Sequence, residues 1–128
     1  HAKRIEWEKQ RNTWKTAMDH TTSNPYTVFE KALSAFAGHE ICDQRLLFVV
    51  ESQGRLVHSW VEELQSVTEA RFRSLQEHQN CCLQAYQTML NGFRLAYQAI
   101  NEKNRFKLND ARNLVREGQQ TLDFAQAA

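Results

Sequence analysis

Apolar side chains recur at the spacing of an α-helix over most of this 128-residue chain, and no other feature limits the possible folds so strongly. The pattern runs through three segments: Leu46, Val50, Val57, Trp60 and Leu64; then Cys82, Ala85, Met89, Phe93, Ala96 and Ile100; and finally Leu108, Ala111, Val115 and Leu122. The chain has only one Pro and four Gly, the residues that punctuate strands and turns. The sequence therefore predicts an all-α protein.

Two helices are predicted before this region. The first runs from Ala2 to about Met18 and ends in a turn-like segment, where Asn24 can cap a helix and Pro25 can take its first position. The second runs from about Tyr26 to Ala37, and Gly38 is its predicted C-terminal stop.

The helix breaks in the remaining chain are less distinct. Turns near residues 78–80 and 101–104 would give an antiparallel helical bundle of four or five long amphipathic helices, the longest from about Glu40 to Glu77. The alternative keeps the last helix unbroken from Cys81 to Phe124 and gives an elongated three-helix coiled coil. The apolar run at residues 45–51 would also suit a buried strand, but the chain offers no second strand to pair with it.

Length and charge indicate a single domain spanning residues 1–128. A chain of this length can bury one core, and its 41% hydrophobic and 24% charged residues are typical of globular proteins. Because the net charge is only +1, we expect no nucleic-acid partner. Since the chain begins at His1 rather than Met, we expect a domain excised from a larger protein, a processed product or a tag remnant.

The three cysteines, Cys42, Cys81 and Cys82, are an odd number without C-x-x-C spacing. They predict neither a disulfide framework nor a zinc site, but reduced and mostly buried thiols in a cytoplasmic compartment. No segment approaches the roughly 18 consecutive apolar residues of a membrane-spanning helix. A membrane-peripheral location is the alternative.

Charge is almost absent from residues 78–101. Arg94 is the only formally charged residue there, although the overall content predicts about six. Because protein interfaces are depleted in Lys and Glu, this helix is predicted to contact a protein partner or a second copy. The alternative is a central helix surrounded by its own neighbours. The predicted contact residues are Trp60, Tyr86, Met89, Phe93, Arg94 and Tyr97.

A second candidate surface is the basic cluster at residues 103–107. Lys103, Arg105 and Lys107 surround Phe106, a combination that can hold phosphate groups while the ring enters a lipid headgroup layer. The more ordinary interpretation is a solvated turn with Phe106 packed into the bundle.

No residue pattern predicts catalysis, a metal or a cofactor. His58 and Glu62 have the i,i+4 spacing of metal ligands, but they supply two ligands at most. Gly-rich phosphate loops and nucleophile elbows are absent from the sequence. We therefore expect a non-enzymatic interaction or assembly domain of the adaptor, scaffold or chaperone-like kind, acting on a protein partner or as a homo-oligomer. The alternative is a peripheral domain that binds an anionic membrane surface through the basic cluster.

Overall fold

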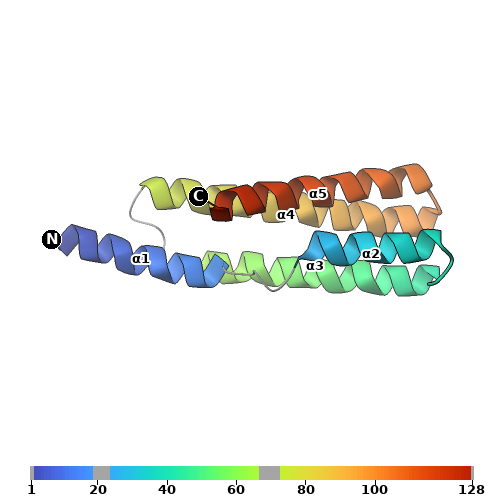
Figure 1. Ribbon diagram of the computed structural model, residues 1–128, viewed down its shortest axis with the longest axis horizontal. Coiled ribbons are helices and arrows are strands. Elements are labelled where there is room, and N and C mark those ends of the chain that lie inside the picture. Colours follow the sequence, from blue (N-terminus) through green and yellow to red (C-terminus); the bar gives the residue numbers. More distant parts are fainter. Residues whose placement is uncertain (1, 19–23, 67–72, 128) are drawn as a thin grey trace.

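The computed structural model describes residues 2–18, 24–66 and 73–127, and every regular element in these ranges is an α-helix. The helices are α1 (Ala2–Met18), α2 (Pro25–Ala37), α3 (Asp43–Ser66), α4 (Arg73–Glu102) and α5 (Arg105–Ala127) (Figure 1). The all-α prediction is confirmed. The strand alternative for residues 45–51 is wrong, because these residues lie inside α3.

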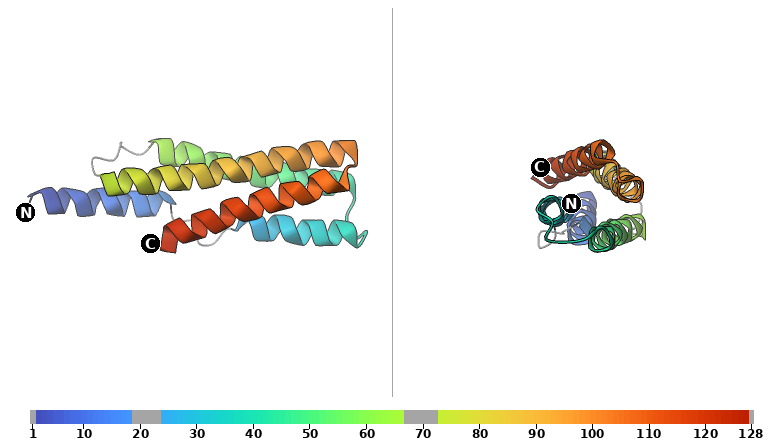
Figure 2. Two further views of the ribbon diagram at one scale, coloured as in Figure 1. Left: turned by 90° about the horizontal axis from the view of Figure 1, so that it is seen from above. Right: turned by 90° about the vertical axis from the view of Figure 1, so that its right-hand side faces the viewer.

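The helices run back and forth along one long axis (Figure 1). α1 and α2 both pack along α3, which returns antiparallel to them, and α4 and α5 form a second antiparallel pair. Seen from the end, α2, α3, α4 and α5 surround a common centre, with α1 behind them (Figure 2). The fold is therefore the predicted antiparallel helical bundle.

The hydrophobic core lies between α2, α3, α4 and α5. Its buried side chains include Phe29 of α2, Leu46, Val57, Trp60 and Leu64 of α3, Cys82, Tyr86, Met89 and Phe93 of α4, and Ala111, Val115 and Leu122 of α5. Two aromatic pairs join different helices: the ring centroids of Phe29 and Phe93 are 5.4 Å apart, and those of Trp60 and Tyr86 are 5.9 Å apart. Such pairs add about 0.5–1.5 kcal/mol each to the stability that burial provides.

α4 and α5 approach each other at two glycines. A Cβ atom on Gly92 would lie 2.9 Å from the backbone nitrogen of Val115, and one on Gly118 would lie 2.8 Å from the carbonyl oxygen of Ala85. Real Cβ atoms do not come this close to a backbone. Neither glycine has a positive φ, so space and not backbone conformation requires them.

Several helix ends lie where the sequence places them. Asn24 precedes α2, and its side chain accepts a hydrogen bond from the backbone N–H of Thr27 at 3.0 Å, while Pro25 is the first helical residue. The predicted turn at residues 101–104 is also confirmed, because α4 ends at Glu102 and α5 begins at Arg105. This turn makes the three-helix alternative wrong. Residues 19–23 of the first predicted turn lie outside the described residues.

The predicted turn at residues 78–80 and the helix from Glu40 to Glu77 are wrong. α3 ends at Ser66, and α4 continues through residues 78–80 and is the longest helix of the described chain. Asparagine and glutamine cost a helix interior only a few tenths of a kcal/mol, and the buried Cys82 continues the apolar seam just beyond them. Residues 67–72, between α3 and α4, lie outside the described part of the chain.

α2 and α4 end in the same kind of turn. After α2, the N–H of Glu40 donates to the carbonyl of Ala35 at 2.8 Å; after α4, the N–H of Asn104 donates to the carbonyl of Ala99 at 2.9 Å. In such Schellman motifs one residue adopts a positive φ, and glycine is preferred there. The positions are held by His39 (φ 60°) and Lys103 (φ 54°). Gly38, the predicted stop, has a φ of −82° and is the C-cap residue before the left-handed position.

Candidate functional site

Four of the six predicted contact residues lie in the core of the chain itself. Trp60, Tyr86, Met89 and Phe93 are at most 5% exposed, and burial is the main cause that raises the pKa of the Tyr86 phenol. For these side chains the interpretation as a central helix fits, because the chain's own helices cover them. In this conformation they offer no surface to a partner.

Arg94 and Tyr97 are exposed. Arg94 faces away from the core, whereas Tyr97 lies at the edge of the core face, one helical turn after the buried Phe93. They belong to the eight exposed residues between the exposed acids Glu77 and Glu102, a surface called here the outer face of α4: Asn80, Gln84, Gln87, Asn91, Arg94, Tyr97, Gln98 and Asn101. Six of these eight are amides, spaced so that they follow one side of the helix. The outer face therefore carries one formal charge.

The exposed residues of the other long helices are different in kind. α3 exposes Asp43, Arg45, Glu51, Arg55, Glu62 and Glu63, and α5 exposes Arg105, Asp110, Arg116, Glu117 and Asp123. Solvated helix faces normally carry such mixed charges. Burial in the core explains why the inner face of α4 lacks charge, but it does not explain the outer face.

The basic cluster at residues 103–107 forms the turn between α4 and α5. The Asn104 side chain caps α5 by accepting hydrogen bonds from the backbone N–H groups of Phe106 and Lys107, each at 3.1 Å. Phe106 is 87% exposed, so the expectation that it packs into the bundle is wrong. As the second residue of α5, it projects away from the core. The turn thus presents an aromatic ring in solvent beside Lys103 and Arg105, which are also exposed.

Lys107, the third cation of the cluster, forms an ion pair with Glu102. Its Nζ lies 2.7 Å from the Glu102 carboxylate, and the hydrogen bond from this ammonium lowers the pKa of Glu102. The pair bridges the end of α4 and the first turn of α5. Lys107 is therefore less available to an external anion than Lys103 or Arg105.

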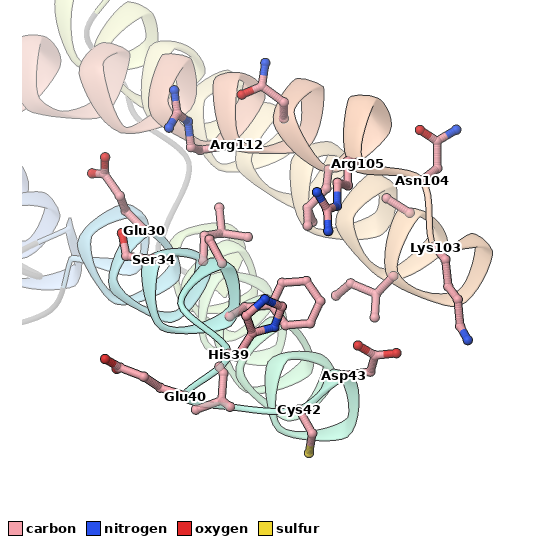
Figure 3. Close-up of a pocket in the computed structure, with 18 of the residues that line it drawn as sticks. Glu30, Ser34, His39, Glu40, Cys42, Asp43, Lys103, Asn104, Arg105 and Arg112 are labelled. Atoms are coloured by element: carbon pink, nitrogen blue, oxygen red, sulfur yellow. The ribbon is translucent and has the colours of Figure 1, made fainter.

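A large cavity, called here the bundle-end cavity, lies beside this turn and was not foreseen from the sequence. It has a volume of 1330 Å³ and opens between α2 and α5, where the turns after α2 and α4 meet (Figure 3). Apolar side chains on its walls include Leu33, Phe36, Ile41, Ile100 and Leu108; ionisable ones include Glu30, His39, Glu40, Asp43, Lys103, Arg105 and Arg112. These residues come from four helices and two turns, so no local sequence motif marks them.

Other candidate chemistry is sparse in the described ranges. No group of three His, Cys, Asp or Glu side chains there could hold a metal ion; His58 pairs with Glu62 at 3.5 Å. The cysteines are unbridged, and only Cys82 is buried, whereas Cys42 is exposed. The prediction of mostly buried thiols is therefore right for Cys82 and wrong for Cys42.

Comparisons with protein-family models, curated proteins and solved structures find no match to this chain. In the part of the chain that the structure describes, none of the helices combines the length and apolar character needed to cross a bilayer.

Proposed function

We propose that this chain is a non-enzymatic assembly domain that associates with a second copy of itself through the outer face of α4. The observation that carries the proposal is the single charge among the eight exposed residues of that face. α3 and α5 expose acids and bases along their length, whereas the exposed acids of α4, Glu77 and Glu102, lie only beyond the two ends of the outer face. The outer face has the composition of a surface that is covered part of the time.

Amide side chains suit a contact between two identical helices. Each Asn or Gln both donates and accepts hydrogen bonds, so two copies of the face can satisfy each other. A face rich in lysine or glutamate would instead oppose like charges and require them to be desolvated. Tyr97, which is 44% exposed, adds the kind of aromatic side chain that is enriched at protein interfaces.

Analytical ultracentrifugation tests the proposal. The wild-type chain is expected to show a concentration-dependent dimer, and the double variant Gln87→Glu/Asn91→Glu is expected to be monomeric, because it places like charges in the middle of the contact. The matched control is Gln44→Glu/Ser59→Glu on the exposed face of α3, which should dimerise like the wild type. All four changes are on exposed residues, and circular dichroism should show unchanged helix content.

Two results would overturn the proposal. A wild-type chain that stays monomeric at concentrations up to the millimolar range does not self-associate through any face. A dimer that persists in Gln87→Glu/Asn91→Glu uses a surface other than the outer face of α4.

A second candidate function is binding to an anionic membrane surface, favoured by the exposed ring of Phe106 beside Lys103 and Arg105. Exposed aromatic and basic side chains together anchor peripheral proteins at headgroups. Flotation with vesicles containing phosphatidylserine should recover the wild type, and recovery should fall for Phe106→Ser and for Lys103→Gln/Arg105→Gln/Lys107→Gln. Equal flotation of all three proteins would eliminate this candidate.

A further inference from the structure

We propose that the bundle-end cavity binds an anionic amphiphile, a carboxylate or phosphate attached to a hydrocarbon chain, with Arg105 and Arg112 holding the anion. The cavity's 1330 Å³ exceeds the roughly 300–1,000 Å³ of typical small-molecule sites. This site is separate from the outer face of α4 and does not depend on the proposed self-association.

The cavity contains apolar surface that the protein leaves partly uncovered. Leu33 and Phe36 of α2, Ile41 of the following turn and Leu108 of α5 all line it. Each packs against the core on one side but remains only partly buried. A hydrocarbon chain lying between α2 and α5 would cover these four side chains, and burial of apolar area is the main favourable term for such a ligand.

The α5 wall supplies cations that no described acid neutralises. Arg105 and Arg112 are seven residues apart, so they lie on the same side of α5, and both line the cavity. No ion pair joins either guanidinium to an acid in the described ranges. Figure 3 shows Arg105 reaching from the start of α5 toward His39 and Asp43. Among the described residues, Nε of Arg112 is buried without a hydrogen-bond partner, and a buried donor normally has an acceptor.

Two of the three described acids on the cavity walls, Glu30 and Glu40, are engaged or turned elsewhere, and the third, Asp43, makes no ion pair with Arg105. Glu30 interacts with the Tyr26 hydroxyl, and burial together with this interaction raises the pKa of that group. Asp43 is in the first turn of α3, where a carboxylate stabilises the helix through its dipole. Glu40 points away from the cavity in Figure 3. The missing group is therefore an anion, and a guanidinium matches the two oxygens of a carboxylate or phosphate.

The left-handed residues at the two turns support a ligand site. His39 and Lys103, the described non-glycine residues with positive φ, both line this cavity. Glycine would relieve the strain at each position, yet an imidazole and an ammonium are placed there. Strained positions of this kind cluster at binding sites.

Isothermal titration calorimetry of the full chain with laurate and with dodecyl phosphate, each below its micelle concentration at pH 8, tests the proposal. Saturable binding of one molecule per chain is expected for at least one of the two anions, and the comparison distinguishes a carboxylate from a phosphate ligand. Dodecyltrimethylammonium and the uncharged dodecyl maltoside should bind at least about tenfold more weakly, because a charge-assisted hydrogen bond contributes roughly 1.5–3 kcal/mol.

Variants identify the site. Arg105→Gln/Arg112→Gln should weaken binding of the anion at least about tenfold, and Leu33→Asp should also weaken it, because it places a like charge on the apolar wall. Arg55→Gln, an exposed arginine on α3 outside the cavity, is the control and should bind like the wild type. Circular dichroism checks that each variant folds; if the double variant does not, Arg105→Gln alone, at an exposed residue, takes its place.

Three outcomes would overturn the proposal. Neither anion binds; the four head groups bind equally well, which indicates adsorption through the hydrocarbon alone; or the folded arginine variant keeps the wild-type affinity.

Discussion

His39 and Lys103 show at the residue scale that this chain does not use the most stable choice at every turn. Both have left-handed backbone angles in Schellman motifs, where an L-residue is strained and glycine is not. The sequence places a glycine one residue before the first of these positions, at Gly38, whose φ is −82°. The strained backbone was not predictable, because the end of α2 had to be placed to within one residue.

Replacing each of these residues by glycine should stabilise the protein. His39→Gly and Lys103→Gly are each expected to raise the free energy of unfolding by about 0.5–1 kcal/mol, since relief of the left-handed strain exceeds the added entropy of glycine in the unfolded chain. Urea denaturation followed by circular dichroism measures the change. His39→Ala and Lys103→Ala, which keep the Cβ atom, are the matched controls and should show no such gain.

A loss of stability in both glycine variants, with the alanine controls unchanged, would contradict this account. It would mean that the His39 and Lys103 side chains stabilise the fold by more than the strain costs.

At the scale of elements, the contact between α4 and α5 depends on two glycines, whose lack of a side chain lets the helices approach closely. A Cβ atom on Gly92 or on Gly118 would lie less than 3.0 Å from a backbone atom of the other helix. Gly54 of α3, by contrast, has room for a methyl group, because the nearest atom is the Cβ of Phe93 at 3.8 Å. All three glycines lie within helices, so they can be compared directly. They differ in the space that is available for a Cβ atom.

Alanine substitutions at the three glycines should have different effects on the free energy of unfolding. Gly92→Ala and Gly118→Ala are each expected to lower the free energy of unfolding by about 1–3 kcal/mol, because the helices must move apart to accept the methyl group. Gly54→Ala should be neutral or stabilising by up to about 1 kcal/mol, because alanine favours helix. Chemical denaturation of the three variants measures this, and equal effects at all three positions would refute the close approach.

The helix ends that a local signal marks were predictable from the sequence. Asn24 and Pro25 mark the start of α2, and the asparagines at 101 and 104 flank the α4–α5 turn. The turn predicted at residues 78–80 was wrong, because these three polar residues lie within the continuous helix α4. For the candidate surfaces, the missing charge of residues 78–101 was visible in the sequence, but the separation into a buried and an outer face was not.

Across the whole molecule, the packing of the helices creates three environments: the hydrophobic core, the solvent-exposed surface and the bundle-end cavity. Residues that belong to the three alternate along the chain. α4 contributes its inner face to the core and its outer face to solvent, while its last residues reach the bundle-end cavity together with α2 and α5. Leu33 and Phe36 of α2 are far in sequence from Leu108 of α5, and only the antiparallel return of the helices brings them to one cavity. For this reason the cavity could not be predicted from residue patterns, whereas the core could.

The buried ionisable groups of α4 make the stability of the entire bundle sensitive to alkali. Burial, with a smaller contribution from Cys81, raises the pKa of the Cys82 thiol from 9.0 to about 12, and burial also raises the pKa of Tyr86. Between pH 9 and 12 the unfolded chain loses the Cys82 proton while the folded chain keeps it. Alkali therefore favours unfolding, and the stability that is present below pH 9 decreases as the pH rises.

The free energy of unfolding should accordingly fall between pH 8 and pH 10, with about 1 kcal/mol of the loss due to Cys82. Urea denaturation at a series of pH values measures the slope. Cys82→Ala lowers stability at every pH because it leaves a cavity in the core, so the slope and not the level is diagnostic. The variant should lose about 1 kcal/mol less than the wild type over this range, while Cys42→Ala, at an exposed thiol, should retain the wild-type slope. Parallel curves for Cys82→Ala and the wild type would show that the Cys82 thiol ionises as readily in the folded bundle as in the unfolded chain.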